Sequence, residues 1–437
     1  MPVLVFSLPS HCHSAIVAMT INDSAARATV IGGGIIGLAS ALSLQQAGFQ
    51  VQVIDRGAPG DGASYGNAGI LAPDGVIPES NPSTLRQVPR YLLDPTGPVA
   101  IRWRYLPRLL PWLARFVAAG RPSRVAEIAS GLAALTERAV TDYAPLTARA
   151  SAEGLIRRGG SLTVYRSAAA LAAAESEHLL RRRHGHTVDV VTGAALHEME
   201  PALSPAIRHA AYFPKKCWVV DPRALSQAFA DAVQAAGGEI VRATIEGFAL
   251  ADDGPAALFS DHGTIDVRTQ TVVIAAGAQS LALTRSLGAN PPLDTERGYH
   301  LMIPNPGIEL RMPVSDAGRG YYATPMAGGL RIAGTVELGG LTAAPNWRRA
   351  DILMRHARQL LPDLDTSDSE RWMGFRPSMP DSLPVISRSP RFHRVLYAFG
   401  HGHLGLTLAA VTGRLVADLA TDKTPIVDPR PYRVDRF

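Results

Sequence analysis

The chain has 437 residues, of which 46% are hydrophobic and 19% are charged. So much apolar material buries a large core, which excludes a disordered protein and predicts two domains or interleaved lobes. The net charge of +5 favours anionic surroundings such as phosphates, carboxylates or anionic lipid. No nucleic-acid module accompanies this charge, so we expect no nucleic-acid partner. Two cysteines exclude a disulfide framework and a multi-cysteine metal site, and we predict no metal.

The N-terminal segment reads as a flexible extension over residues 1–26. Its apolar run Val3–Leu8 has no Lys or Arg before it and Pro9 interrupts the segment, so it is a poor secretory signal. Met19 stands shortly before the first predicted strand and could be the natural start. No stretch approaches the apolar length needed to span a bilayer. We therefore expect a cytoplasmic protein.

A glycine-rich turn follows the first predicted strand. The apolar run from Ala28 ends in Gly32-x-Gly34-x-x-Gly37, then come a small-residue helix and a second apolar strand that closes with Asp55. Gly32 permits the tight turn, Gly34 lets the backbone approach a pyrophosphate, and Gly37 lets helix and strand pack closely. The helix start faces the phosphates, and the Asp55 carboxylate can bind ribose hydroxyls. The pattern predicts bound FAD or NAD.

The next segment, Ala63–Leu71, is a loop of small residues punctuated by glycines. Such a loop suits a backbone that lies against a flat ligand, although an ordinary surface loop has the same composition.

From Leu85 to Val125 aromatic side chains alternate with arginines, most densely over Trp103–Phe116. One interpretation is a packed amphipathic hairpin whose arginines extend into water. The other is a surface that lies on an anionic membrane.

Further nucleotide-type segments occur in the middle and at the end of the chain. Asp221-Pro222 opens a helix that Gly237-Gly238 ends, and an apolar strand runs into Gly277. Antiparallel strands are predicted over Tyr299–Ile303, Tyr321–Thr324 and Gly329–Gly334. We therefore predict an α/β fold with a discontinuous Rossmann-like FAD-binding domain of the glutathione-reductase type and an interleaved α+β substrate domain built on an antiparallel sheet. The first comprises residues 27–75, 221–290 and 372–437, and the second residues 76–220 and 291–371.

The chain resembles the D-amino acid oxidase superfamily of FAD-dependent oxidoreductases, and within it the bacterial D-amino acid dehydrogenase branch. The landmarks of the resemblance extend over nearly the whole chain from Ala28 onward. They are Val30–Gly37, Ser64–Gly69, Asp221-Pro222, Val272–Ser280, Gly374-Phe375-Arg376-Pro377, Pro380-Asp381-x-x-Pro384 and Gly400-His401-Gly402-x-Leu404-Gly405-x-Thr407.

The resemblance implies FAD as the cofactor, bound noncovalently because no His or Cys stands at the positions of a covalent link. The cofactor-binding residues that it implies belong to the glycine turn, the second strand, the small-residue loop, the middle strands and the last helix. They are Gly32, Gly34, Ile35, Ile36, Gly37, Asp55, Arg56, Ser64, Asn67, Ala68, Gly69, Ile70, Ile245, Ala276, Gly277, Gly402, His403, Leu404, Gly405 and Thr407.

For the substrate, the resemblance makes Arg376 the ligand of a carboxylate, and a guanidinium can bind a carboxylate through two parallel hydrogen bonds. A structural ion pair is the alternative for this residue. Tyr299 and Tyr322 could complete the site, with Tyr321 in place of Tyr322 if the strand is shifted by one residue. His403 is a further catalytic candidate. The helix that starts near it would stabilise negative charge on a reduced flavin.

The expected reaction is hydride transfer from Cα of a D-amino acid to flavin N5. It yields an imino acid, which water converts to a 2-oxo acid and ammonia. Alternatives are a dehydrogenase of D-proline or 4-hydroxy-D-proline, a glycine or sarcosine oxidase, and a flavin-binding subunit without turnover of its own. The expected electron acceptor is a quinone or an electron-transfer chain, with peripheral contact to the inner face of the cell membrane through the Trp103–Phe116 segment.

Overall fold

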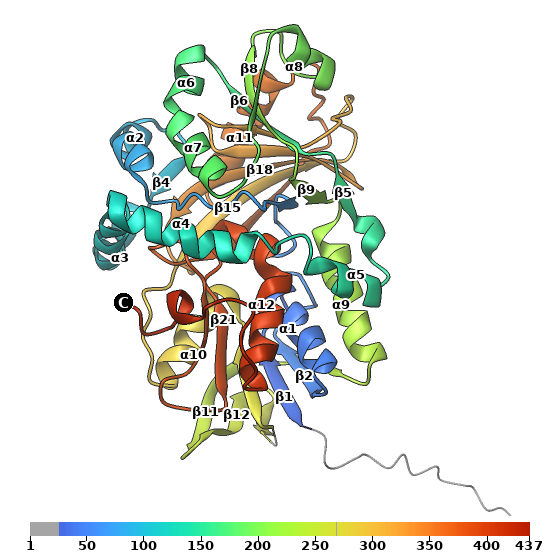
Figure 1. Cartoon of the computed structure of the whole chain (residues 1–437), viewed down its shortest axis with the longest axis vertical. Helices are drawn as coiled ribbons and strands as arrows, with labels where there is room; N and C mark the ends of the chain where they lie inside the picture. The colour runs from blue at the N-terminus through green and yellow to red at the C-terminus, as the bar shows by residue number, and fades with distance from the viewer. Residues whose placement is uncertain (1–25, 268) are drawn as a thin grey trace, which may run out of the picture.

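The computed structural model describes residues 26–267 and 269–437 (Figure 1). The expected extension over residues 1–26 lies outside the described residues, apart from Ala26. Two large sheets form two lobes, one below the other in Figure 1, and segments from the start, middle and end of the chain meet in the lower lobe.

The lower lobe is built on a six-stranded sheet. Its order is β10 (Glu239–Arg242), β2 (Gln50–Asp55), β1 (Arg27–Ile31), β14 (Thr271–Ile274), β21 (Val395–Phe399) and β20 (Val385–Arg388). The edge strand β20 runs antiparallel to β21, and the other neighbours pair in parallel. The central strands are continuous apolar runs because both faces of a parallel sheet are covered.

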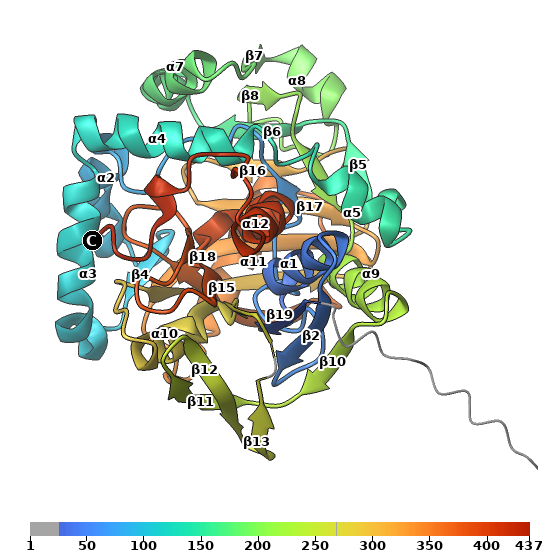
Figure 2. The ribbon, with the colours of Figure 1, turned by 60° about the horizontal axis from the view of Figure 1, so that its bottom comes forward.

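Helices cover one face of this sheet. α1 (Ile35–Gln46), α9 (Pro222–Ala235) and α12 (Gly405–Ala420) share one core with Val30 and Val273. α1 and α12 lie side by side (Figure 2), so close that a Cβ on Gly413 would be 2.5 Å from the carbonyl oxygen of Ala39.

The other face of the six-stranded sheet packs against a small antiparallel sheet and a short helix. These are β11 (Ile245–Ala251), β12 (Gly254–Ser260), β13 (Gly263–Asp266) and α10 (Ser280–Ser286). Alternate strand residues such as Ile31 and Ile274 belong to this second core, as the period of two requires.

The upper lobe is built on a nine-stranded mixed sheet. Its order is β19 (Glu370–Ser378), β15 (Asp294–Ile303), β18 (Gly329–Leu338), β17 (Tyr321–Met326), β16 (Val314–Asp316), β6 (Ser161–Tyr165), β8 (His209–Phe213) and β7 (Asp189–Thr192), with β4 (Val99–Ile101) also paired to β18. Helix α11 (Arg348–Leu360) packs on one face of this sheet, in one core with Tyr299 and Tyr321.

The expected boundary at residue 372 is wrong. We expected residues from 372 onward to belong to the FAD-binding domain, but β19 pairs with β15 along its whole length and completes the edge of the larger sheet. The chain leaves that sheet only after Ser378.

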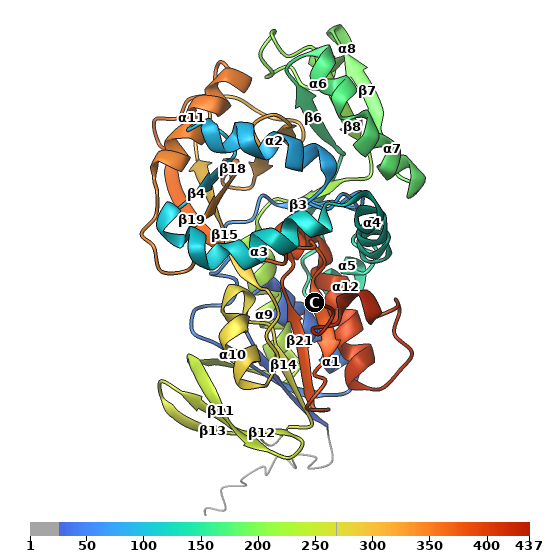
Figure 3. The same cartoon turned by 90° about the vertical axis from the view of Figure 1, so that its left-hand side faces the viewer.

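A three-stranded sheet lies between the lobes, and further helices pack around them. The sheet contains β3 (Ile70–Leu71), β9 (Cys217–Val219) and β5 (Ile156–Arg158). The helices are α2 (Pro82–Leu93), α3 (Leu106–Ala119), α4 (Pro122–Thr136), α5 (Tyr143–Arg149), α6 (Ala168–Ala173), α7 (Glu175–Arg183) and α8 (Ala194–Met199). Figure 3 shows α3 and α4 beside the junction of the lobes.

The aromatic and basic segment forms a 3₁₀ turn, Trp103–Tyr105, followed by α3. Leu109 and Trp112 are buried, whereas Trp103 is 69% exposed. The segment is therefore packed on one face and carries exposed apolar side chains on the other. Among the described residues, no helix has the length and apolar character needed to cross a membrane.

Candidate active site

A cavity of about 990 Å³ extends from the carboxyl ends of β1 and β2 to the nine-stranded sheet of the upper lobe. Of the cofactor residues that the sequence predicted, all except Gly37 and Gly69 line it. The predicted substrate residues Arg376, Tyr322 and His403 line it as well, and Tyr299 does not. The structure therefore brings both predicted sets of residues to one place.

The three glycines of the first turn have different roles. Gly32 has a φ of +121°, and a Cβ there would lie 2.3 Å from the carbonyl oxygen of Ala275. A Cβ on Gly37 would lie 1.8 Å from the carbonyl oxygen of Gly32, so Gly37 supports the turn without lining the cavity. Around Gly34 the nearest atom, Ser64 Oγ, would be 3.4 Å away. The protein itself leaves room at Gly34, which fits a pyrophosphate at this position.

Polar groups at the start of α1 complete this part of the cavity. Asp55 accepts hydrogen bonds from the amides of Gly33 (2.6 Å) and Gly57 (2.8 Å) and lies beside the turn. Ser64 Oγ accepts a hydrogen bond from the amide of Ile35 (3.0 Å). Ser64 thus lies beside the glycine turn, at the start of α1.

A side chain from the upper lobe fixes the loop of small residues. Arg331, a buried residue of β18, donates to the carbonyl oxygens of Tyr65 (2.9 Å) and Asn67 (2.8 Å). Asn67 Oδ1 in turn accepts from the amide of Gly69 (2.7 Å), where φ is +80°. Gly69 therefore directs the path of the loop and does not line the cavity. Sequence reasoning missed Arg331, because nothing near the loop in the chain points to it.

The last helix presents its start to the cavity. Gly402, His403, Leu404 and Gly405 line the cavity where α12 begins, and no side chain of the described residues caps this end. Its free amides and the positive end of the helix dipole favour negative charge in the cavity. The preceding His401 is structural: burial lowers its pKa to about 3, and Nε2 lies 2.9 Å from Thr412 Oγ1.

Arg376 reaches the cavity from β19 across the neighbouring strands. Its Nη1 donates to the carbonyl oxygen of Thr335 on β18 (3.0 Å). Its guanidinium passes over Gly298 of β15, so closely that a Cβ there would lie 2.4 Å from Cζ. One hydrogen bond to a neutral carbonyl leaves other N–H donors of the guanidinium for a carboxylate.

Alternate residues of β19 continue the wall of the cavity beside Arg376. The indole of Trp372 covers Gly374 and Gly66, where added Cβ atoms would lie 2.0 and 1.7 Å from it. His300 stacks behind this indole at 5.0 Å, and burial lowers its pKa to about 3. His300 is therefore neutral and supports Trp372.

The two predicted tyrosines lie on opposite faces of the sheet, so the prediction for Tyr299 was wrong. Tyr299 points into the core beneath α11 and donates to Glu337 (2.5 Å). Tyr321 lies on the same face and donates to the carbonyl oxygen of His356. Tyr322 faces the cavity, because successive residues of a strand point to opposite faces.

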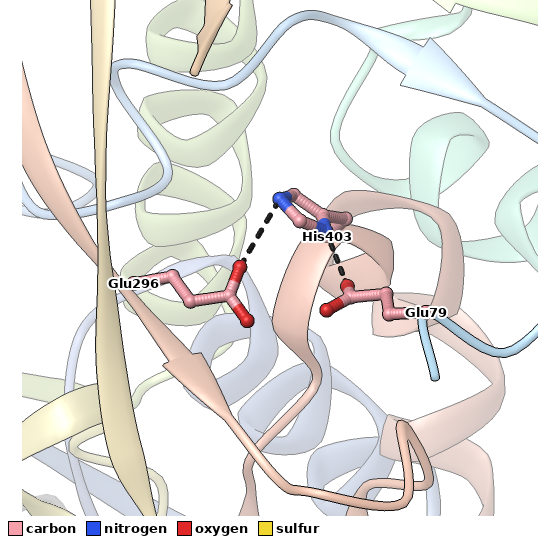
Figure 4. A group of neighbouring side chains, drawn as sticks. All are labelled: Glu79, Glu296 and His403. Atoms are coloured by element: carbon pink, nitrogen blue, oxygen red, sulfur yellow. Dashed lines mark hydrogen bonds and ion pairs between the residues drawn. The ribbon is translucent and has the colours of Figure 1, made fainter. Parts of the chain in front are cut away.

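His403 lies between two carboxylates (Figure 4). Its Nδ1 is hydrogen-bonded to Glu79, and its Nε2 lies 3.4 Å from Glu296 Oε2. Burial disfavours charge on the imidazole, but the adjacent Glu79 carboxylate raises the pKa of His403 above its usual range. Burial and then the charge of Glu79 raise the pKa of Glu296 to about 7. The Glu79 carboxylate therefore favours the imidazolium form of His403.

The ligand atoms of His403, Glu79 and Glu296 lie within 4.8 Å of one another, which is compatible with a metal ion. Each imidazole nitrogen, however, faces a different carboxylate, so the three groups do not converge on one point. The positive charge of Arg376 also lowers the pKa of both carboxylates, and it disfavours the binding of a further cation between them. We interpret the group as a His403 imidazolium held between the carboxylates of Glu79 and Glu296.

A second charged group lines the cavity near Tyr322 and was not predicted. It contains Asp74, Arg181 and Lys216, which come from three separate segments of the chain. The only local signal in the sequence is the pair Lys215-Lys216 directly before a buried strand, where an ammonium can reach a cavity.

The model of the family described as FAD dependent oxidoreductase (DAO) matches residues 27–419. A D-amino-acid oxidase from Bradyrhizobium diazoefficiens is 38% identical over 415 residues, which cover 93% of this chain and 98% of that protein. A D-amino acid dehydrogenase from Paramagnetospirillum magneticum is 34% identical, with 94% and 99% covered.

Solved structures share the fold. A glycine oxidase from Geobacillus kaustophilus has a TM-score of 0.68 at 24% identity, with 94% of this chain and 99% of that chain covered. An L-proline dehydrogenase from P. horikoshii has a TM-score of 0.70 at 18% identity, with 94% and 98% covered. The family match, the relatives that extend over nearly the full length, and the cavity at the glycine turn agree, and the chain belongs to the DAO family of FAD-dependent oxidoreductases.

Proposed function

We propose that this protein oxidises D-amino acids at the Cα–N bond, giving an imino acid that water converts to a 2-oxo acid and ammonia. The observation that carries the proposal is the Arg376 guanidinium, which is held over Gly298 and lines the cavity. The names of the two full-length relatives, an oxidase and a dehydrogenase of D-amino acids, support the substrate class.

In this proposal Arg376 binds the α-carboxylate and thereby fixes the direction of the Cα–H bond. Trp372 and Tyr322 wall the cavity and exclude water. The Glu79 carboxylate favours the imidazolium form of His403, which adds positive charge beside the start of α12 and does not accept the proton of the substrate amine. Bound FAD supplies the hydride acceptor. The amine must therefore be neutral before the C–H bond breaks.

The experiment that tests the proposal is anaerobic mixing of the flavoprotein with a panel of substrates while the visible flavin absorption is followed. The panel contains D- and L-amino acids, D-proline, 4-hydroxy-D-proline, glycine and sarcosine. Bleaching by primary D-amino acids supports the proposal. Bleaching by the secondary amines or glycine alone supports one of the alternative substrates, and bleaching by none supports a flavin-binding subunit without turnover.

We further propose that electrons leave to a quinone at an anionic membrane surface, onto which α3 docks. Trp103, Leu110 and Val117 are exposed large hydrophobic residues of this segment. Among the described residues, the exposed Arg104 and Arg108 form no ion pair, so their charge is free for acidic headgroups.

Vesicle co-sedimentation tests this surface. Binding to vesicles with anionic lipid, with loss in Arg108→Glu, supports docking. Arg183→Glu on α7 is the matched control, since it makes the same charge change at another exposed site. Equal binding by both variants, or no binding by the natural chain, contradicts docking. Reoxidation of the reduced flavoprotein by a quinone in preference to oxygen supports a dehydrogenase.

A further inference from the structure

The unpredicted charged group in the cavity contains buried polar atoms without adequate partners. Lys216 is 5% exposed, and its Nζ makes one long hydrogen bond, to Tyr322 Oη (3.4 Å). Nζ lies 3.5 Å from Asp74 Oδ2, and Arg181 Nε lies 3.4 Å from the same oxygen. Arg181 Nε and Asp74 Oδ1 have no hydrogen-bond partner in the described residues. Buried groups in this condition are costly unless a ligand satisfies them.

The charges of the group favour an anion. Two cations, Lys216 and Arg181, share the single carboxylate of Asp74 inside the cavity. Glu177 is 3.7 Å from Arg181 Nη1, but its side chain is 32% exposed, so it compensates Arg181 from the solvent side. Lys216 has no second carboxylate within ion-pair distance in the described structure. Its ammonium also lies 4.2 Å from the centre of the Phe213 ring, which holds it at the cavity wall.

The group and Arg376 line the same cavity, and their partners lie on neighbouring strands. Arg376 is bonded to Thr335 on β18, and Tyr322, which accepts from Lys216, lies on the adjacent strand β17. Neighbouring strands are ~4.8 Å apart and rise ~3.3 Å per residue. The α-carboxylate and the end of an amino acid side chain can therefore each contact a cation in this cavity.

Resting on the proposed function, we infer that Lys216 and Arg181 form a side-chain subsite that selects D-amino acids with a carboxylate side chain, of the D-glutamate or D-aspartate type. The spare N–H groups of Lys216 and Arg181 donate to the two carboxylate oxygens. A carboxamide of the same shape offers one acceptor oxygen and no charge, so it is bound less well.

The test uses matched pairs of substrates on the holoenzyme. Rates of anaerobic flavin bleaching are measured against concentration for D-glutamate and D-glutamine, for D-aspartate and D-asparagine, and for D-methionine as a neutral substrate. We expect the acid of at least one pair to exceed its amide in kcat/KM by about tenfold or more, because a charged hydrogen bond is involved.

Two variants then locate the selectivity. Lys216→Met is expected to remove the preference for the acid while D-methionine still reduces the flavin. Lys215→Met, the same change at the exposed neighbouring residue, is expected to keep the preference.

The inference is overturned if the natural chain prefers the amides, or if Lys216→Met leaves the ratio of acid to amide unchanged. If Lys216→Met does not fold, the ratios of kcat/KM for acid and amide substrates of the natural chain still test the inference. Failure of the proposed function is recognised separately, since then no D-amino acid bleaches the flavin.

Discussion

Replacing Gly298 by alanine tests whether Arg376 holds the substrate through its position above β15. The added Cβ would lie 2.4 Å from both Cζ and Nη2 of Arg376, whereas carbon atoms in contact are separated by about 3.5–4.0 Å. The guanidinium must therefore retreat by about 1 Å. Because the clash involves the end of a flexible side chain and Gly298 has no left-handed φ, the strand itself tolerates alanine.

A misplacement of about 1 Å costs roughly a hundredfold in rate, or about 3 kcal/mol of transition-state stabilisation. We expect kcat/KM for D-amino acids to fall by about that factor, with an unchanged flavin content and melting temperature. Steady-state kinetics and thermal unfolding measure both. Gly154→Ala is the control, because a Cβ there meets no atom within 4 Å. A Gly298→Ala enzyme with natural kinetics and full flavin content would refute the placement of Arg376.

Three further predictions concern the cofactor turn, the core and the charge beside Arg376. Gly37→Ala should yield protein without flavin in its absorption spectrum, because the Cβ would lie 1.8 Å from a backbone oxygen, and retention of FAD contradicts this. Tyr299→Phe should leave kcat/KM unchanged and destabilise the fold by about 1–3 kcal/mol in denaturant unfolding, through loss of its hydrogen bond to Glu337; a kinetic defect would return Tyr299 to the active site. Ionised Glu296 competes for the charge of Arg376, so an amine-free carboxylate should bind more weakly as pH rises through about 7, and Glu296→Gln should flatten this titration; a flat curve in the natural enzyme contradicts it.

The cofactor end of the cavity was predictable because its determinants are local. The turn from Gly32 to Gly37 and the carboxylate of Asp55 lie within 25 residues of one another, and backbone conformation dictates the glycines. The motif therefore predicts both the conformation of the turn and the class of ligand that binds there. Gly69 was predicted to bind the cofactor, but it does not line the cavity, and its φ of +80° serves the path of the loop.

The substrate end required strand register, which the sequence does not state. Tyr299 pairs across β18 with Gly334, and Gly334 pairs with Tyr321, so these two tyrosines share the core face and Tyr322 faces the cavity. Once the strand pairing is known, placing Tyr322 at the cavity also places Tyr299 in the core, on the opposite face of the sheet. Shifting a strand by one residue exchanges its two faces.

Other site residues are joined only by tertiary packing. Glu79 lies 324 residues from His403, with which it is hydrogen-bonded, and Arg331 lies 264 residues from Asn67. Lys216 meets Asp74 in the same way. No local sequence pattern marks charged residues of this kind, because they meet only when the sheets fold.

The most direct measurement of the central claim is a crystal structure of the FAD-loaded protein with a carboxylate ligand that it cannot oxidise. The account predicts that the ligand carboxylate lies on the Arg376 guanidinium, with the isoalloxazine against the start of α12. A carboxylate bound elsewhere while Arg376 points away from the ring would contradict it.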